Sequence, residues 1–241
     1  MNGSTGTSVS IPADSAAEQF AQLAIALHDG PTVEETVEMV LSFGLKATGA
    51  DHAGVIFVHG KKRVETAAAT DPIVAKVDAI QMDIGEGPDV SVLEDRLSVI
   101  VDDTHGDNRW PHWAGLVAEA GIRSLLSVRM YTSETVVGTL NLYSLRPNAF
   151  DTDDQDVAHI LARHAAVALA SARKLENLWQ AVDARKRIGQ AQGMLMERFD
   201  LNSDQAFAVL LRYSQDNNIK LRAVADLLIE TRSLPGAGPE H

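Results

Sequence analysis

Apolar residues recur at helical spacing at the start of the chain. Between residues 16 and 28 they mark one helix, which Gly30-Pro31 ends. A second helix follows at once, because Thr32 and Glu35 form a capping-box pair ahead of apolar residues that share one face. The pattern predicts two consecutive amphipathic helices.

The middle of the chain changes to the short, alternating apolar runs of β-strands. His59-Gly60-Lys61 is a turn between the first two runs, and Pro88 and Pro111 fit the first turns of short helices, with Gly121 as a helix C-terminal cap. The expected strands cover residues 53–58, 64–69, 97–101, 124–131 and 136–144. We expect an α+β domain in which helices flank an antiparallel sheet.

From Thr152 the pattern is helical again, with Thr152 and Gln155 as a capping box and no breaker before Phe199-Asp200. A 3.5-residue apolar repeat within this helix is typical of a parallel coiled coil. Its members are Ala168, Ser171, Leu175, Leu178 and Val182. A monomeric packed helix is the alternative, but a helix this long has a far half that the first domain cannot bury, so we expect a homodimer.

Two shorter helices complete the chain. Asn202 or Ser203 caps the first, and Asn217-Asn218 separates it from the last, which carries Leu221, Val224 and Leu228 on one face. With the end of the long helix they predict an all-α three-helix bundle.

Composition narrows the possible functions. The chain has 241 residues, no cysteine and a formal net charge of −12, which excludes disulfides and thiol chemistry and argues against non-specific coating of nucleic acid. Residues 185 to 222 are an exception, with seven basic and four acidic residues. No signal peptide or membrane-length apolar run is evident, so we expect a cytoplasmic protein with disordered ends at residues 1–14 and 233–241.

Residues 15–173 resemble a GAF domain in several stretches that occur in order. These are Asp51-His52-Ala53-Gly54-Val55, Gly85-Glu86-Gly87-Pro88, Asp107-Asn108-Arg109-Trp110-Pro111, Gly121-Ile122-Arg123-Ser124-Leu125 and Gly138-Thr139-Leu140-Asn141-Leu142-Tyr143. The resemblance implies an unidentified small-molecule ligand held between sheet and helices. Asp89 stands where related sequences often have cysteine, and the Asn-Lys-Phe-Asp-Glu signature of cyclic-nucleotide binders is missing.

A ligand pocket of this kind needs aromatic walls with a few polar anchors. Candidate lining residues are Asp89, His105, Arg109, Trp110 and Trp113. The alternative is that the tryptophans are core or lid residues and the histidine is solvated. Asp102-Asp103 with His105 and Asp107 could suggest acid–base catalysis, but a polar loop explains them better, and we expect neither a metal site nor an enzyme.

Residues 174–232 combine the coiled-coil linker helix with a region that resembles an ANTAR domain, a family of transcription antitermination regulators. The matching stretches are Ile188-Gly189-Gln190-Ala191-Gln192-Gly193-Met194-Leu195-Met196, Ala206-Phe207, Leu210-Leu211, Ser214-Gln215 and Lys220-Leu221-Arg222-Ala223-Val224-Ala225. The resemblance implies binding to paired RNA stem-loops in nascent transcripts. A DNA-binding helix-turn-helix and a protein-interaction module remain the competing interpretations.

The residues of this region divide into packing and recognition groups. Gly189, Ala191 and Gly193 would let a neighbouring helix approach, and Leu195 and Phe207 would fill the bundle interior. Phosphate contacts or contacts to unpaired bases are expected from the polar remainder. The candidates are Arg185, Lys186, Arg187, Gln190, Gln192, Arg212, Tyr213, Gln215, Asn218, Lys220 and Arg222.

Overall fold

The computed structural model describes residues 21–22, 25–27, 32–59 and 63–233. The chain divides into two compact units, residues 1–173 and residues 174–241, and each is considered by itself. Much of the helix expected over residues 16–28, the turn at Gly60-Lys61, the expected disordered end at residues 1–14 and all but Ser233 of the one at residues 233–241 lie outside the described residues.

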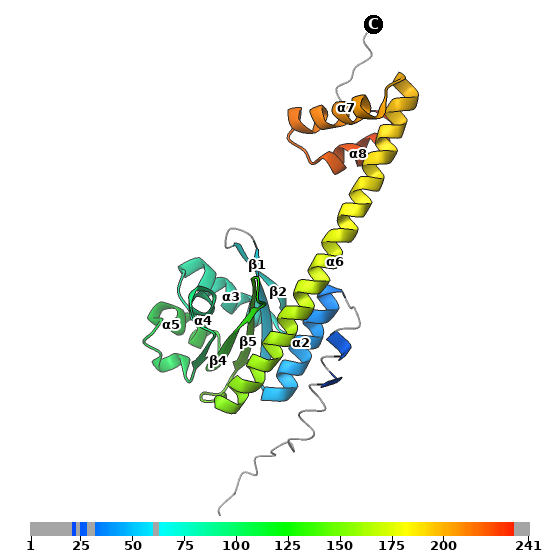
Figure 1. The fold of residues 1–241 in the computed structure, drawn as a ribbon. Coiled ribbons are helices and arrows are strands. Elements are labelled where there is room, and N and C mark those ends of the chain that lie inside the picture. The colour runs from blue at the N-terminus through cyan, green and yellow to red at the C-terminus, as the bar shows by residue number, and fades with distance from the viewer. Residues whose placement is uncertain (1–20, 23–24, 28–31, 60–62, 234–241) are drawn as a thin grey trace, which may run out of the picture. The chain divides into compact units, whose positions relative to one another are not determined.

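An antiparallel five-stranded sheet, in the order β2-β1-β5-β4-β3, forms the centre of the first unit (Figure 1). The strands are β1 (His52–His59), β2 (Arg63–Ala69), β3 (Ser98–Val101), β4 (Ser124–Tyr131) and β5 (Val136–Ser144). The predicted α+β class is confirmed, and the bounds of β4 and β5 agree with those expected from the alternation.

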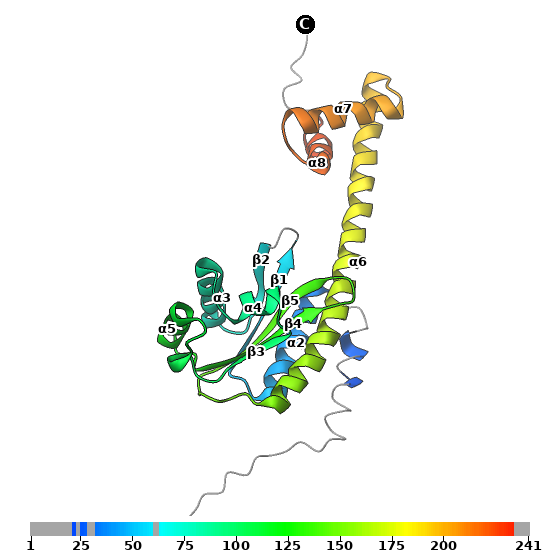
Figure 2. The ribbon, with the colours of Figure 1, turned by 60° about the vertical axis from the view of Figure 1, so that its left-hand side comes forward.

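Helices cover both faces of this sheet. The helix α2 (Val33–Thr48) and the first part of α6 (Thr152–Phe199) lie on one face (Figure 2). The opposite face carries α3 (Pro72–Ile84), α4 (Pro88–Glu94) and α5 (Pro111–Glu119), and a short 3-10 helix, η2 (Thr104–Gly106), precedes α5. Each face therefore has its own hydrophobic core.

Local chemistry determines where these helices begin. The predicted capping box of Thr32 and Glu35 starts α2. At α6 the expected pair of Thr152 and Gln155 is wrong. The Asp151 carboxylate instead accepts from the backbone N–H groups of Asp153 and Asp154, at 2.9 and 3.0 Å, and Gln155 turns toward β3. A carboxylate at this position also interacts favourably with the helix dipole.

The sequence pattern did not predict the helix α3. Asp71 caps it through the Ile73 N–H at 2.9 Å, and Pro72 occupies its first turn. Only a narrow stripe, including Val74 and Val77, is apolar and buried, because the same face also buries Asp78 and Gln81. Polar residues on the buried side weaken the amphipathic signal.

The helix α6 runs for 48 residues without interruption, as predicted. Leu161, Ala165 and Leu169 are fully buried against the sheet. Further along, Leu175 and Val182 are 51% and 57% exposed, so the second half of the apolar repeat has no cover within the described part of the chain.

The second unit is a three-helix bundle, as predicted, made by the end of α6 with α7 (Ser203–Asp216) and α8 (Leu221–Thr231). Its core contains Ala191, Leu195, Ala206, Leu210, Val224, Ala225 and Leu228. Three packing assignments are wrong. Phe207 is 38% exposed, and a methyl group added at Gly189 or Gly193 would meet nothing within 4 Å. These residues face outward because α7 and α8 pack on the Ala191 side of α6.

Within the described residues, no helix is long and apolar enough to cross a membrane.

Gly138 permits the close approach of β1 and β5, because a Cβ there would lie 1.8 Å from the Ile56 carbonyl oxygen. We expect Gly138→Ala to lower the free energy of unfolding by about 1–3 kcal/mol or more, measured by urea denaturation. Gly115→Ala is the control, because Gly115 is exposed in α5 with nothing within 4 Å of its Cβ position, and it is expected to gain about 0.5–1 kcal/mol. Equal effects of the two changes would contradict the close approach.

Candidate ligand pocket and nucleic-acid interface

The two faces of the sheet differ in chemistry. The face toward α2 and α6 is apolar, with Leu126 and Val128 of β4 beside Leu140 and Leu142 of β5. The face toward α3, α4 and α5 is partly polar, because alternate residues point to opposite sides of a strand. On that side Ser127 pairs in register with Asn141, and Tyr143 follows two residues along β5. All three are fully buried.

Asp89 lies at the start of α4 and is fully buried above this polar strip. Its carboxylate accepts from the Ser127 hydroxyl at 2.6 Å, from the Asn141 amide at 2.9 Å and from the Gln81 amide. The side-chain amide oxygen of Gln81, Oε1, accepts in return from the Asp89 backbone N–H at 3.0 Å. Side chains from α3, β4 and β5 therefore converge on one carboxylate.

A second buried carboxylate, Asp78, lies on α3 one helical turn before Gln81. It accepts from the Tyr143 hydroxyl at 2.6 Å and from the Thr66 hydroxyl at 3.0 Å. We refer to the following residues, all buried except the half-buried Thr66, as the buried polar cluster: Thr66, Asp78, Gln81, Asp89, Ser127, Thr139, Asn141 and Tyr143.

Burial controls the protonation of this cluster. Desolvation, followed by repulsion from Asp89, raises the pKa of Asp78 well above the usual range of an aspartate. Desolvation also raises the pKa of Asp89, against the hydrogen bonds that favour its ionised form, and burial raises the pKa of Tyr143. Within the described residues, neither carboxylate forms an ion pair.

Four buried polar atoms in or beside the cluster have no hydrogen-bond partner, namely Asn141 Oδ1, Thr139 Oγ1, the Trp113 indole Nε1 and Nη2 of Arg129, which lies opposite Thr139 in the sheet. Asn141 uses its other amide atom on Asp89, so its free oxygen belongs to the same cluster. Buried polar atoms normally find partners, and an unsatisfied one costs about 1–3 kcal/mol. Such atoms are typical of sites that are completed by a ligand or by water.

The Gly85-Glu86-Gly87-Pro88 turn positions Trp113 over this region. The Glu86 carboxylate accepts from the backbone N–H groups of His112 and Trp113, both at 2.9 Å, which satisfies the first turn of α5 and lowers the pKa of Glu86. Gly87 has a φ of 147°, and a Cβ there would lie 2.6 Å from Gln81 Oε1 and 3.2 Å from the Trp113 ring. Only glycine fits this close approach without displacement.

The predicted pocket residues separate into two groups. Asp89 and Trp113 are fully buried in the second core, and Trp110 packs edge-on against Trp113 with ring centroids 5.9 Å apart. His105 and Arg109 are exposed.

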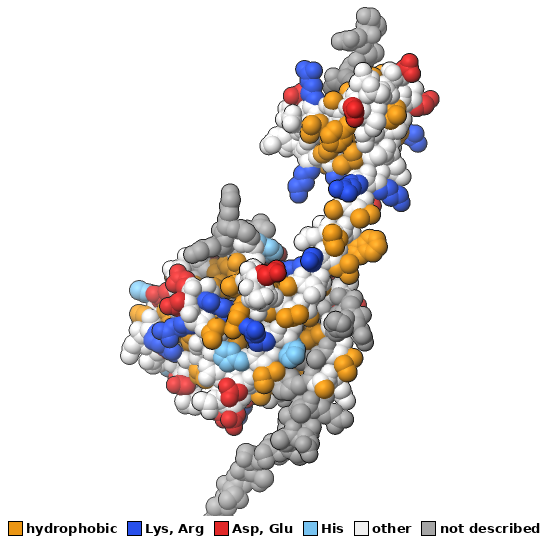
Figure 3. Space-filling view, viewed as in Figure 1, with side chains coloured by type: hydrophobic (Ala, Val, Ile, Leu, Met, Phe, Trp, Pro, Cys, Tyr) orange, Lys and Arg blue, Asp and Glu red, His pale blue; other side chains and the backbone are white. Residues whose placement is uncertain are grey.

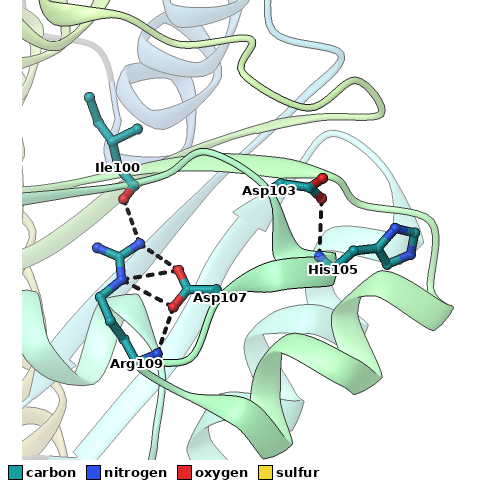
Figure 4. A network of polar contacts seen from close by, with 5 residues as sticks. All are labelled: Ile100, Asp103, His105, Asp107 and Arg109. Carbon is teal, nitrogen blue, oxygen red and sulfur yellow. Dashed lines mark hydrogen bonds and ion pairs between the residues drawn. The ribbon is translucent and has the colours of Figure 1, made fainter.

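The exposed pair lies in an outer loop (Figure 4). The Arg109 guanidinium is turned to the Asp107 carboxylate and donates to the Ile100 carbonyl oxygen at 2.8 Å. It also lies 4.7 Å from the centre of the Trp110 ring. The His105 backbone N–H donates to Asp103 at 3.0 Å, while its imidazole points away from Asp103. The pocket residues predicted from the sequence thus include both buried and exposed side chains. The prediction omitted five residues of the buried polar cluster, namely Asp78, Gln81, Ser127, Asn141 and Tyr143. For Ser127, Asn141 and Tyr143, the polar character of alternate positions on β4 and β5 was the available signal.

Within the described residues, no group of three or more His, Asp and Glu side chains is arranged to hold a metal ion.

In the helical bundle, half of the predicted cationic residues are engaged in ion pairs. Arg187 contacts Asp226 at 2.5 Å, and Arg222 contacts Asp183 at 2.6 Å, so these two pairs join α6 to α8. Arg212 lies 3.6 Å from Asp216 on the same helix. The first two arginines hold the bundle together and have less freedom to reach a phosphate.

The other three, Arg185, Lys186 and Lys220, are exposed and have no ion pair among the described residues. The pair of Arg222 with Asp183 brings the start of α8 beside this part of α6. Lys220, two residues before Arg222, therefore lies at the same end of the bundle as Arg185 and Lys186. Figure 3 shows Lys and Arg side chains at the end of the bundle where α6 enters it. We call these three residues the unpaired cations.

The predicted polar contacts are distributed around the bundle. Gln190 is exposed on α6, while Gln192 donates to the Ser203 carbonyl oxygen at 3.2 Å and is half-buried. Gln215 is exposed, and Asn218 has a φ of 52° at the turn between α7 and α8. Tyr213 is half-buried and packs against the bundle core.

The fold defines a protein of two parts, an α+β domain that holds the buried polar cluster, followed by a helical bundle that carries the unpaired cations. Comparison with protein families identifies both parts of the chain. A model described as GAF domain matches residues 30–170, and one described as ANTAR domain matches residues 176–229. The chain belongs to the GAF domain family and carries an ANTAR domain after it. At the family level this is the architecture of a sensor-regulated, RNA-binding antitermination regulator rather than of an enzyme.

Solved structures support the fold. The GAF domain of a phosphoenolpyruvate-protein phosphotransferase from Coxiella burnetii is 17% identical with a TM-score of 0.55, covering 69% of this chain and 99% of that one. Free methionine-R-sulfoxide reductase from Neisseria meningitidis is 16% identical with a TM-score of 0.54, covering 71% and 98%.

The phytochrome photosensory core module from Stigmatella aurantiaca is 12% identical with a TM-score of 0.59, covering 87% of this chain and 46% of that one. The chain therefore spans less than half the length of that phytochrome module. At these identities the likeness shows the fold alone. No curated protein matches the chain.

Asp78→Asn tests the buried cluster through the pH dependence of stability. The pKa of Asp78 is raised in the folded state, so folding binds protons above pH 4 and the parent loses stability as the pH rises through that raised pKa. At pH 8 we expect Asp78→Asn to be more stable than the parent by about 1–3 kcal/mol, and this gain should vanish near pH 4. Urea unfolding at the two pH values measures it.

Asp83→Asn is the matched control, because Asp83 is an exposed carboxylate on the same helix. Its effect should stay within about 0.5 kcal/mol at both pH values. A pH-independent effect of Asp78→Asn would contradict the assigned direction of the shift.

Proposed function

We propose that this chain is a ligand-responsive antitermination regulator that binds paired RNA stem-loops through its C-terminal bundle and acts as a cytoplasmic homodimer. The observation that carries the proposal is the group of unpaired cations at one end of a bundle that matches the ANTAR domain. Exposed guanidinium and ammonium groups without carboxylate partners are the ones able to replace the counterions of a phosphate backbone.

The surface around these cations suits RNA. Next to them on α6, Gly189 and Gly193 are exposed and leave the helix surface without side chains. Each glycine costs an exposed helix about 1 kcal/mol relative to alanine, so their presence favours a functional reason such as close approach of a partner's backbone. Gln190 lies between them and offers both a donor and an acceptor to base edges.

Replacing Arg185, Lys186 and Lys220 with glutamine tests this interface. We expect RNA stem-loop affinity to fall at least tenfold and the slope of log affinity against log salt to lose about 0.9 for each phosphate contact removed. A gel-shift titration at several salt concentrations measures both. The combined change of Lys46, Lys76 and Arg96 to glutamine, at exposed positions of the first unit, is the control, because it also removes three positive charges and should leave both quantities unchanged.

Unchanged affinity and salt slope in the triple variant would refute the assignment of the RNA face, provided that its circular dichroism spectrum and melting temperature match those of the parent.

The proposed dimer rests on the apolar stripe of α6. Leu178, Trp179 and Val182 are 57%, 65% and 57% exposed, and Figure 3 shows hydrophobic side chains gathered on this stretch of the helix. An exposed apolar seam at heptad spacing is stabilised when a second helix covers it. Two bundles joined in this way would bind two stem-loops in one transcript, and the second binding event would become intramolecular.

Leu178→Glu combined with Val182→Glu should convert the dimer to a monomer in sedimentation-velocity measurements. Affinity for an RNA with two stem-loops should fall by at least tenfold, while affinity for one stem-loop changes little, because only the second contact is lost. Leu116→Glu is the control, since Leu116 is 44% exposed on α5 and lies outside the stripe. A doubly substituted protein that stays dimeric would refute this seam.

The continuity of α6 suggests how ligand binding reaches the output domain. At its start, Gln155 Nε2 donates to Ser98 Oγ at 2.7 Å, and His159 Nε2 lies 2.9 Å from the same hydroxyl. Ser98 belongs to β3, and its neighbour Val99 is part of the second core. A ligand that moves β3 would therefore pull on α6, and the helix would carry the movement toward the bundle as a rigid element.

A further inference from the structure

The buried polar cluster gathers acceptor atoms in one place, and one of them, the Asn141 Oδ1 atom, has no donor. Two carboxylates, Asp78 and Asp89, are fully buried in the same core, and the free Asn141 Oδ1 atom lies beside Asp89. Five neighbouring groups donate to the carboxylates, and all five are neutral amides or hydroxyls. The charge of the pair is thus solvated by dipoles, and among the described residues no cation pairs with it, because Arg129, opposite Thr139, donates to the Val92 carbonyl oxygen at 2.6 Å.

Physical chemistry makes such a pair costly. A buried charge is normally paired or protonated, because removal of an unpaired ion from water costs several kcal/mol. Donors arranged around a carboxylate favour its ionised form, and the Asp89 carboxylate accepts three of them. The site is therefore organised to hold negative charge, and a positive group that enters it would remove the largest unfavourable contribution.

Aromatic groups line the same core. The Tyr143 hydroxyl donates to Asp78, and the fully buried Trp113 packs beside Gly87 and leaves its indole N–H without an acceptor. Aromatic rings stabilise cations in a desolvated site, and the free N–H suits an acceptor atom on the same molecule. Metal ions fit less well, because no described group of three His, Asp and Glu side chains is arranged to hold one.

We infer that the ligand of the sensor domain is a small organic cation with N–H donors, an ammonium or guanidinium compound, whose charged group lies between Asp78, Asp89 and Asn141 Oδ1. This inference rests on the proposed function, in which the domain senses a small molecule, and it specifies the chemical class. A carbonyl or ether oxygen on the ligand would accept from Trp113.

Thermal unfolding of the full-length protein tests the inference. The probes are ethylammonium, glycinamide and agmatine as chloride salts, and the matched controls are acetamide, sodium acetate, magnesium chloride and tetramethylammonium chloride. At least one N–H cation should raise the melting temperature saturably by about 3 °C or more, because a ligand that binds only the folded state stabilises it. Tetramethylammonium should give no such rise, since it has no N–H group for Asn141 Oδ1.

Two variants connect any shift to the site. Asp78→Asn and Asp89→Asn should each abolish the shift, whereas Asp83→Asn, on the exposed side of α3, should retain it. Two substitutions are used so that failure of one to fold leaves the other informative. The inference is overturned if no N–H cation gives a shift that these variants abolish, or if acetamide, acetate or magnesium stabilises the parent equally well.

The same preparations separate this inference from the proposed function. RNA stem-loop titration reports on the bundle without any probe. RNA binding without a cation-specific shift in melting temperature would contradict the inferred ligand class but would agree with the proposed RNA-binding function. A cation-specific shift in melting temperature without RNA binding would agree with the inferred ligand class but would contradict the proposed RNA-binding function.

Discussion

The packing of α6 on the apolar face of the sheet is the contact on which the rest of the chain depends. Leu161, Ala165 and Leu169 are fully buried there, and the small alanine lets the helix lie close to the strands. The same helix continues without a break to Phe199, where Ala191 and Leu195 form one wall of the second core. One continuous helix therefore contributes to the core of both units.

The opposite face of the sheet has a different physical role. Ser127, Asn141 and Tyr143 occupy positions where apolar side chains would contribute more to stability, and they support two carboxylates that are costly to bury. Sites that bind ligands commonly keep such unfavourable groups because a partner compensates them. One face therefore stabilises the domain and positions α6, while the other holds the buried polar cluster, and Ser98 of β3 contacts α6 through Gln155 and His159.

The periodicity of apolar residues was sufficient to predict the elements that have one clear repeat. The alternation of β4 and β5 and the long repeat of α6 predicted their extents closely. The helix α3 was missed because Asp78 and Gln81 interrupt its apolar stripe, and the same omission hid these two members of the buried polar cluster. Phe207 was misassigned because α7 carries more apolar residues than two neighbouring helices can cover. Local pattern does not reveal which apolar residues a small bundle leaves outside.

Electrostatics also explains why the proposed output would depend on pairing two bundles. The chain carries a net charge of −12, and Debye screening over about 8 Å at physiological salt limits that repulsion to nearby groups. Within the bundle, Asp183 and Asp226 engage Arg222 and Arg187, so these arginines stabilise the packing of α8 on α6 and contribute less to phosphate binding. A few unpaired cations give only a weak attraction per bundle. Two bundles linked through α6 gain affinity from effective concentration, and the pose of α6 would then decide whether both engage the transcript at once.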